Sequence, residues 1–379
     1  MSNQLIPTIT ISANTSWYLY NFRASTIRRL LAEGYRVVCL SPADDYSQKL
    51  ITDLGCEWLP LVMNNQGSNP FKDAGLVHQF WRHYRALKPV AALHFTIKNN
   101  VYGTWAARAL SVPVINNVSG LGTAFIRTGL VSAIVRLLYK TSQPLAHRVF
   151  CQNEDDLNQL AENRLVPRER LELLPGSGVD LERFSPGLRE PRSGTFRFLY
   201  AGRMLADKGL NELIAAVRMI NAKGLQCSLW LSGFPDVENV SAISQQQLSE
   251  WSEEAGIEWM GPSDVMEKVY AAVDCVVLPS YREGMPRSLL EAGAMGLPVV
   301  TTNVPGCRNV VRDGYNGLLC EVKDSTSLMQ AMLKMLALPD DERARMGENG
   351  RTLVAERFGE HLVVEATMRA VESAVQERA

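Results

Sequence analysis

The chain has 379 residues, of which 46% are hydrophobic and 21% charged, a balance that suits a globular protein of about two domains and excludes a disordered chain. Its 39 basic and 40 acidic residues give a net charge of -1, so there is no overall basic excess to attract nucleic acid. The 7 cysteines show no C-x-x-C spacing, which argues against a zinc knuckle or a disulfide framework and favours the reducing cytosol. No apolar run approaches the roughly 18 residues of a membrane span, and we expect no secretory signal.

Short apolar runs alternate with longer segments of helical period through the first half of the chain. This is the pattern of βα units on a parallel sheet, so the expected fold class is α/β. The expected strands of this half lie near residues 8–13, 36–41, 90–95, 112–118 and 148–152. The expected helices between them include residues 22–33, 76–87 and 102–110.

The pattern breaks at residues 184–194, where prolines, glycines and charged residues cluster, and then resumes. The expected strands of the second half are residues 196–201, 227–232, 275–278 and 299–301, with helices at 210–222, 264–272 and 287–295. We therefore predict two doubly wound Rossmann-like domains facing across a cleft, where the carboxyl ends of their strands would bind ligands. The predicted bounds are 1–185 and 186–358, followed by a C-terminal helix within 359–379.

Several common catalytic motifs are missing from the sequence. There is no Gly-Lys dipeptide, which excludes a P-loop, and the nearest dinucleotide fingerprint has Leu181 at its third glycine position. There is also no G-x-S-x-G elbow and no H-E-x-x-H pair. These absences argue against a P-loop nucleotide triphosphatase, a Rossmann dehydrogenase, an α/β-hydrolase and a zinc protease.

The strongest motif is a loop and helix directly after the buried strand expected at 275–278. Pro286 suits the first helical turn, and the amides of Gly284 and Met285 then face the same way as the helix N-terminus, which attracts anions. Glu283 lies in the loop, and Glu291 lies roughly 7 Å further along the helix axis. Carboxylates accept hydrogen bonds from hydroxyls and repel phosphates. The motif therefore suits a ligand with hydroxyl-bearing rings on both sides of a phosphate, such as a nucleotide sugar.

A second motif follows the strand expected at 196–201. Gly202 permits close backbone approach, and Arg203 and Lys208 can offset the charge of a diphosphate. The alternative is that these cations are solvated loop residues and that Glu291 is an ordinary helix carboxylate. Both motifs end strands of one predicted sheet and favour the same ligand, which supports the functional interpretation.

At these residues the chain resembles the retaining glycosyltransferases of family 4, which have the GT-B fold. Glu283 and Glu291 match the Glu-x7-Glu signature of that family. A second element, G-R-x(n)-K-G, is matched by Gly202, Arg203, Lys208 and Gly209. An Ala-Glu-Arg-Phe stretch at 355–358 is also typical. Three first-half segments, 13–23, 94–100 and 116–122, resemble enzymes that build bacterial capsule, O-antigen or related lipid-linked glycans.

The resemblance implies roles for the matching residues. Arg203 and Lys208 would stabilise the departing nucleoside diphosphate, Glu283 would orient hydroxyls of the donor sugar, and Glu291 would hold the ribose. The first three of these residues are the expected catalytic set. Gly202 and the backbone near Gly284, Met285 and Pro286 would complete the donor site. The resemblance implies no metal and no other cofactor, and a last helix that crosses back onto the first domain.

The first half departs from the family pattern. Ser119 precedes Gly120 where many members have a histidine, and serine is a poor general base at its free pKa. A donor phosphate oxygen is therefore the expected proton acceptor. His94 either lines the cleft or is a structural histidine. The expected acceptor-side residues are Asn14, His94, Ser119 and Gly120. The early glycine pair of the family is replaced at 16–18, so the first-domain phosphate contacts remain open.

The segment 126–140 is apolar, but Ser132, Arg136 and Lys140 share one helical face. It is either a basic amphipathic helix that contacts the membrane peripherally or a core helix with a narrow solvated stripe. We expect a cytoplasmic enzyme of bacterial surface polysaccharide synthesis. It would move a hexose or N-acetylhexosamine, with retention, from a nucleotide sugar, UDP being the first choice, to a polyprenyl-diphosphate-linked or related glycan. The alternatives are a nucleotide-sugar 2-epimerase and a non-catalytic nucleotide-sugar sensor.

Overall fold

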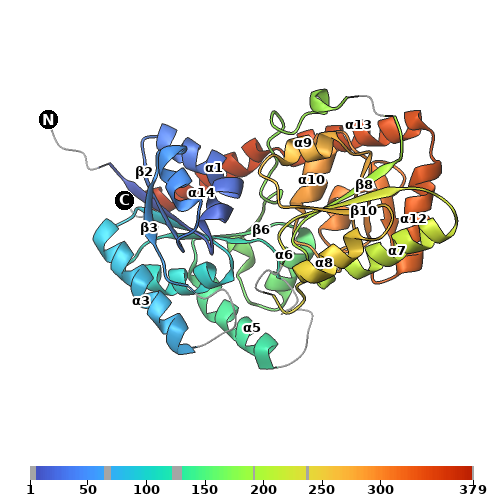
Figure 1. Cartoon of the computed structure of the whole chain (residues 1–379). Helices are drawn as coiled ribbons and strands as arrows, with labels where there is room; N and C mark the ends of the chain where they lie inside the picture. Colours follow the sequence, from blue (N-terminus) through green and yellow to red (C-terminus); the bar gives the residue numbers. More distant parts are fainter. Residues whose placement is uncertain (1–5, 64–69, 122–129, 191–192, 236–238, 378–379) are drawn as a thin grey trace. The chain divides into compact units, whose positions relative to one another are not determined.

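The computed structural model describes residues 6–63, 70–121, 130–190, 193–235 and 239–377. The chain divides into two compact units (Figure 1). Unit 1 contains the residues up to Ser177 together with those from His361 onward, and unit 2 runs from Gly178 to Glu360. The chain thus leaves unit 1 earlier than the boundary expected at 185. The reason is that Phe184 is 1% exposed and belongs to the hydrophobic core of unit 2.

Unit 1 is built on a parallel sheet of seven strands within the described residues, in the order β3-β2-β1-β4-β5-β6-β7. The strands are β1 (Thr8–Ser12), β2 (Arg36–Ser41), β3 (Glu57–Pro60), β4 (Ala91–Phe95), β5 (Val114–Val118), β6 (Arg148–Cys151) and β7 (Leu171–Leu173). The direction of strand addition reverses between β1 and β4. Ligands of such sheets bind beside the carboxyl ends of the strands at this reversal.

Helices of unit 1 alternate with these strands. They are α1 (Ser16–Ala32), α2 (Ser47–Thr52), α3 (Pro70–Leu87), α4 (Thr104–Arg108), α5 (Leu130–Ser142), α6 (Glu154–Glu162) and α14 (Glu360–Gln376), with the π-helix η1 (Asn99–Gly103) and the 3₁₀ turns η3 (Gln143–Leu145) and η4 (Arg168–Arg170). Helix α1 begins at Ser16, earlier than expected, because the Thr15 hydroxyl accepts a hydrogen bond from the Tyr18 amide at 3.0 Å. The C-terminal helix α14 packs its apolar face, including Val363 and Val371, into the same core as β1.

Unit 2 repeats the architecture with six parallel strands among the described residues, in the order β10-β9-β8-β11-β12-β13. They are β8 (Arg197–Ala201), β9 (Ser228–Ser232), β10 (Ile257–Gly261), β11 (Cys275–Leu278), β12 (Val299–Thr302) and β13 (Gly317–Cys320). The reversal falls between β8 and β11, which pair through Cys275 with Phe198 and Val276 with Leu199. The two loops singled out in the sequence follow these two strands, so they share one edge of the sheet.

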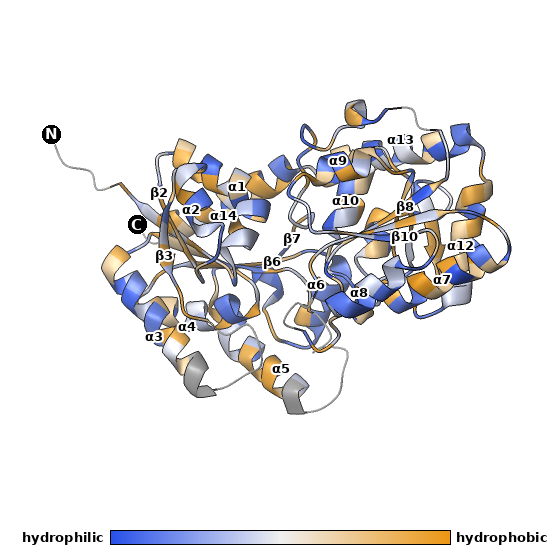
Figure 2. Cartoon of the chain, viewed as in Figure 1, coloured by the Kyte–Doolittle hydropathy of each residue, from blue (hydrophilic) through white to orange (hydrophobic). Residues whose placement is uncertain are grey.

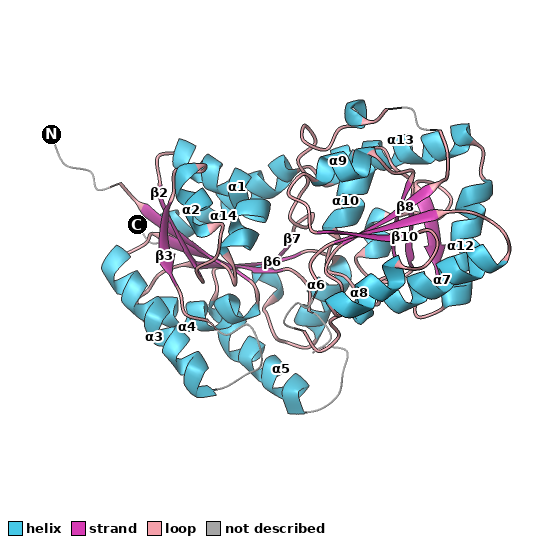
Figure 3. Ribbon diagram, viewed as in Figure 1, coloured by secondary structure: helices cyan, strands magenta, loops and turns pink. Residues whose placement is uncertain are grey.

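The helices of unit 2 flank its sheet on both faces (Figure 3). They are α7 (Leu210–Ala222), α8 (Gln245–Ser252), α9 (Met266–Ala271), α10 (Arg287–Ala294), α11 (Cys307–Val310), α12 (Ser325–Ala337) and α13 (Asp340–Arg357), with the 3₁₀ turns η5 (Pro186–Leu188) and η6 (Ala206–Lys208). The two doubly wound sheets confirm the expected α/β fold class. None of the helices in the described ranges is long and apolar enough to cross a membrane.

Candidate functional site

The loops after β8 and β11 are packed against each other. The Tyr281 amide, in the loop after β11, donates to the carbonyl of Asp207 in η6 at 3.0 Å. Gly209 has a φ of +75°, and a side chain there would collide with the carbonyl of Pro279. Glycine is therefore required at this point by both the backbone conformation and the close approach. The two loops form one structural unit at the reversal of the sheet.

Lys208 and Glu283 form an ion pair that joins these two loops. Their side chains are only 17% and 13% exposed. Partial burial strengthens the attraction between opposite charges, because the effective dielectric constant is lower than in water. The structure thus brings together two residues that the sequence placed 75 positions apart, and it holds a cation and a carboxylate side by side.

The loop after β12 supports Glu283 from the next strand. The Glu283 amide donates to the Pro305 carbonyl at 3.3 Å. Gly306 has a φ of +83°, and a Cβ there would lie 2.7 Å from the Glu283 carbonyl oxygen. Cys307 is buried next to this loop, and burial, followed by the nearby Glu283 charge, raises the pKa of its thiol to about 12. The backbone of Glu283 is therefore fixed by close packing on residues that the sequence analysis did not single out.

Arg203 and Gly202 lie where β8 ends. The buried Tyr200 hydroxyl donates to the Arg203 carbonyl at 2.7 Å, and a Cβ at Gly202 would lie 3.2 Å from that hydroxyl. Burial, with a smaller contribution from Glu283, raises the pKa of Tyr200, so the phenol stays neutral and can act as a donor. The Arg203 side chain is exposed, and its guanidinium makes no hydrogen bond or ion pair within the described residues. The Arg203 guanidinium is therefore accessible from solvent.

Glu291 lies in α10 with 12% of its side chain exposed. One carboxylate oxygen accepts from Arg287 Nε at 2.8 Å, and the other accepts from the Tyr270 hydroxyl at 3.0 Å. Burial, followed by the Glu291 charge, raises the pKa of Tyr270, which keeps the phenol protonated as a donor. Neither partner was predicted from the sequence. Arg287 carries a detectable signal, because it lies one helical turn before Glu291, whereas Tyr270 comes from another helix, α9.

The amino end of α10 differs slightly from the expectation. Pro286 is the N-cap residue, with φ -74° and ψ 110°, and Arg287 is the first helical residue. The expected position of Pro286 inside the first turn is therefore wrong by one residue, because its ψ is extended. The Pro286 carbonyl still accepts the first helical hydrogen bonds, from Leu289 and Leu290. Gly284 and Met285 precede it at intermediate exposure, and Met285 packs partly on the core.

His94, an acceptor-side candidate in unit 1, is fully buried. Its Nδ1 lies 3.0 Å from Asn116 Oδ1 and its Nε2 lies 2.7 Å from the Tyr84 hydroxyl. A Cβ at Gly103 would lie 2.7 Å from the ring, so η1 covers it closely. Burial lowers the pKa of His94 to about 3, and the imidazole is neutral. Of the two interpretations left open by the sequence, this geometry favours the structural one.

The other acceptor-side candidates follow β1 and β5, which lie on either side of β4 in the unit 1 sheet. Ser119 and Gly120 come directly after β5, and Gly120 has a φ of +139°. Ser119 Oγ lies 3.3 Å from the Tyr18 hydroxyl in the first turn of α1. Asn14 lies just before α1 at intermediate exposure. Tyr18, which contacts Ser119, was not predicted as a candidate from the sequence.

The described part of the expected membrane segment is α5, since residues 126–129 lie outside the described residues. Hydrophobic residues are prominent on the coloured part of this helix (Figure 2). Ser132, expected on the solvated stripe, is 6% exposed, whereas Leu137 is 60% and Ile134 is 37% exposed. Lys140 is exposed on the same side, one turn after Leu137. The solvent-facing side of α5 is therefore more apolar than a purely solvated stripe.

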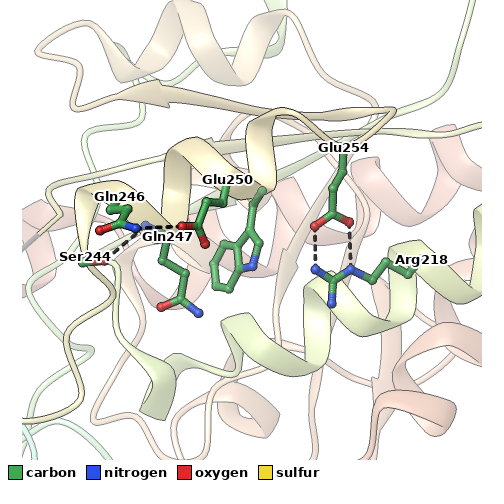
Figure 4. Close-up of a pocket in the computed structure, with 7 residues that line it drawn as sticks. Arg218, Ser244, Gln246, Gln247, Glu250 and Glu254 are labelled. Carbon is green, nitrogen blue, oxygen red and sulfur yellow. Dashed lines mark hydrogen bonds and ion pairs between the residues drawn. The ribbon is translucent and has the colours of Figure 1, made fainter.

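A separate surface pocket lies between α7 and α8 (Figure 4). Arg218 donates to both carboxylate oxygens of Glu254 at 2.7 and 2.5 Å, and Glu250 lines the same pocket. It shares no residue with the loops after β8 and β11. Its two carboxylates disfavour a phosphate, so this pocket does not fit the donor expected from the sequence.

Two family models match the chain. The model described as "Glycosyl transferases group 1" matches residues 188–353, and the "Glycosyl transferase 4-like domain" model matches residues 22–176. The chain is 27% identical to the N,N'-diacetylbacillosaminyl-diphospho-undecaprenol alpha-1,3-N-acetylgalactosaminyltransferase of Campylobacter jejuni, over 86% of this chain and 88% of that protein. It is 24% identical to the UDP-Gal:alpha-D-GlcNAc-diphosphoundecaprenol alpha-1,3-galactosyltransferase of Escherichia coli, over 69% of each.

Solved structures show the same fold at low sequence identity. HepE of Anabaena, in complex with UDP and glucose, matches 97% of this chain and 100% of its own with a TM-score of 0.78 at 16% identity. Sucrose-phosphate synthase from Thermosynechococcus elongatus matches 98% of this chain and 100% of its own with a TM-score of 0.79 at 18% identity. The two family models place the chain among the group 1, family 4-like glycosyltransferases, and the solved structures show the GT-B fold.

Proposed function

We propose that this glycosyltransferase moves a hexose or N-acetylhexosamine from a UDP-sugar to a polyprenyl-diphosphate-linked glycan in bacterial surface polysaccharide synthesis, with retention at the anomeric carbon. The observation that carries the proposal is the joined pair of loops after β8 and β11. They hold Lys208 against Glu283, and the loop that carries Lys208 also carries the exposed cation of Arg203. The family match favours a transferase over the epimerase and the sensor that the sequence left open.

The charges in the two loops fit the two ends of a sugar diphosphate. In the transition state, negative charge develops on the leaving diphosphate, and cations already in place stabilise it most effectively. Arg203 and Lys208 would supply these cations, together with the amides that precede α10. Glu283, held by its pair with Lys208, would accept hydrogen bonds from sugar hydroxyls, and Glu291 would do so from the ribose.

The proposed reaction takes place on one face of the sugar. The acceptor hydroxyl oxygen forms a bond to the anomeric carbon on the face from which the bond to the phosphate oxygen breaks. The acceptor proton passes to that departing phosphate oxygen, so no protein base is required, in agreement with Ser119 at the position of the family histidine. Both relatives named above are described by alpha-1,3 linkages, which supports retention from an alpha-linked donor.

The choice of substrates rests on the relatives. The E. coli relative is named for UDP-Gal, and the HepE structure holds UDP, which supports a uridine nucleotide. The C. jejuni and E. coli relatives both carry a diphospho-undecaprenol group in their acceptors' names, which supports a lipid-linked diphosphate. Such an acceptor lies in a membrane. The exposed Ile134, Leu137 and Lys140 of α5 would allow peripheral contact with the cytoplasmic face of that membrane.

The test is transfer of radiolabelled sugar from a panel of UDP-hexoses and UDP-N-acetylhexosamines to a bacterial lipid extract. Arg203→Ala and Lys208→Ala should each lower transfer by about 100-fold or more, because each removes a preorganised donor to the leaving group. Arg218→Ala, which removes an exposed cation outside the two loops, is the matched control and should transfer normally. Equal transfer by all four proteins would refute the site.

Four further readouts test the finer parts of the proposal. The anomeric configuration of the product, determined by NMR, should match that of the donor sugar. Chelation by EDTA should leave the rate unchanged, because Arg203 and Lys208 supply the charge that a metal would otherwise supply. Incubation without acceptor should leave the donor sugar unchanged, whereas conversion of the donor to its 2-epimer would show the alternative isomerase. Flotation with anionic liposomes tests α5, and Leu137→Asp should weaken it.

A further inference from the structure

Arg23 is a buried cation on the core-facing side of α1, with 1% of its surface exposed. Its Nη2 donates to the Tyr18 hydroxyl at 3.0 Å and to Ser177 Oγ at 3.2 Å, and its guanidinium carbon lies 4.1 Å from the centroid of the Phe95 ring. Within the described residues no carboxylate pairs with it, and its Nε has no hydrogen-bond partner. A buried charge without a counter-ion is costly, so this position needs an explanation beyond packing.

The hydrogen bonds of Arg23 lead to the surface. A guanidinium has only donors, so the Tyr18 oxygen accepts from it. Tyr18 Oη also lies 3.3 Å from Ser119 Oγ. Donation from a cation makes the Tyr18 hydroxyl a stronger donor in turn, because hydrogen bonds in a chain polarise one another. Ser119 then accepts from Tyr18 and keeps its own proton for a ligand. Tyr18 and Ser119 are partly exposed, although Arg23 is not.

These groups lie where the unit 1 sheet is expected to bind a ligand. Tyr18 and Arg23 belong to the helix after β1, Phe95 ends β4, and Ser119 follows β5. The strand order reverses between β1 and β4. Thr96, directly after Phe95, has a φ of +73°, which is a strained backbone for a β-branched residue. Strain of this kind is concentrated at functional sites.

We propose that Arg23, Tyr18 and Ser119 form a relay that binds an anionic oxygen of the acceptor's diphosphate. The uncompensated charge of Arg23 favours an anion at the end of the relay, and the Ser119 hydroxyl is the group that donates to it. Tyr18 and Arg23 are positioning residues that act through Ser119. The proposal rests on the proposed function, because it takes its ligand from the lipid-linked diphosphate acceptor. It assigns phosphate contacts to unit 1, for which the sequence allowed no prediction because residues 16–18 replace the glycine pair of the family.

The test compares Tyr18→Phe and Ser119→Ala with Tyr20→Phe. The Tyr20 hydroxyl donates to Asp53 at 2.8 Å on the exposed side of the same helix, so its loss is the matched control. Steady-state kinetics with a polyprenyl-diphosphate-linked sugar should show a KM for the acceptor about tenfold higher in both relay variants. The KM for the donor should be unchanged, and Tyr20→Phe should behave as wild type. Equal acceptor KM values in all proteins would overturn the relay.

Two controls separate phosphate binding from contact with the acceptor sugar and from effects on turnover. With an alkyl glycoside acceptor that carries the same sugar and no phosphate, wild type and Tyr18→Phe should have the same KM. A rise as large as with the diphosphate acceptor would show that the relay contacts the sugar, which contradicts the proposal. Equilibrium binding of the lipid-linked diphosphate sugar to wild type and Tyr18→Phe gives the second readout, independent of turnover.

A tenfold weaker affinity of Tyr18→Phe in this binding assay supports the relay, even if the enzyme transfers no sugar. A lack of transfer by itself would refute only the proposed function. Equal affinity, or no binding by wild type, refutes the relay. Arg23→Lys keeps the charge but loses the forked geometry of the guanidinium, and should give an intermediate KM for the acceptor if it folds. The thermal melting of each variant is measured alongside, so that a loss of folding is recognised.

Discussion

The buried His94 predicts a specific pH dependence of stability. Its ring accepts from the Tyr84 hydroxyl at Nε2 and donates from Nδ1 to Asn116, so the folded protein holds a neutral imidazole. Burial lowers the pKa of His94 to about 3 from the ordinary value of 6.5. Between these two pH values the unfolded chain binds a proton that the folded chain rejects. Titration of His94 therefore costs the folded protein no stability above pH 6.5. As the pH falls below 6.5, the folded protein loses stability.

The size of the effect follows from the width of this interval. Each pH unit below 6.5 costs about 1.4 kcal/mol as long as the pH stays above the folded pKa. At pH 5, about 1.5 pH units below the unfolded value, the loss is about 2 kcal/mol relative to pH 7. His94 is completely buried, so solvent screening does not reduce this loss of stability. His94→Gln removes the titrating group and should remove this part of the pH dependence, whatever it does to stability at pH 7.

The assay is hydrogen–deuterium exchange of peptides from β4 and β5, which reports the opening free energy of unit 1 without assuming that the whole chain unfolds at once. Wild type should lose about 2 kcal/mol more opening free energy than His94→Gln between pH 7 and pH 5, after correction for intrinsic exchange. His361→Gln, which removes an exposed histidine, should follow wild type. An identical pH dependence in wild type and His94→Gln would contradict the buried, neutral state of His94.

Of three further predictions, the first two concern unit 2, and the third concerns the cysteines of both units. Gly306→Ala should destabilise the protein by about 1–2 kcal/mol and lower sugar transfer, because the new Cβ would collide with the Glu283 carbonyl. The control is Gly314→Ala: Gly314 also has a positive φ, of +72°, but no atom lies within 4 Å of the new Cβ. This variant should destabilise the protein without lowering transfer. Arg218→Ala should change the free energy of unfolding by at most about 1 kcal/mol in urea denaturation, because its pair with Glu254 is largely exposed. The 7 cysteines are all buried, so the native protein should react with less than one equivalent of a thiol reagent at pH 8. In the urea-unfolded protein, all 7 cysteines should react.

The central strands and the donor loops could be predicted from the sequence because they are carried by local patterns. The strands β8 and β11 are continuous apolar runs, as buried parallel strands require, and each is followed by a glycine-containing loop and a helix. The edge strands β3 and β7 were not predicted. β3 has no fully buried residue and β7 has only three residues, so neither shows a periodic signal.

The contacts of the site depend on register and could not be predicted in the same way. Nothing local to Lys208 or Glu283 shows that their side chains meet, because the contact requires β8 and β11 to be neighbours. The buried state of His94 likewise depends on Tyr84 and on Gly103 in η1. Arg23 does carry a local signal, since it lies four residues after Leu19 on the apolar face of α1. That Arg23 is buried without a carboxylate partner among the described residues can be seen only in the structure.

A crystal structure of the protein with UDP tests the donor site most directly. We expect the diphosphate within about 3 Å of the Arg203 guanidinium and the Lys208 ammonium, next to the amides before α10, with the ribose toward Glu291. UDP bound elsewhere, for example in the pocket between α7 and α8, with no nucleotide in the loops after β8 and β11, would contradict the assignment of these residues.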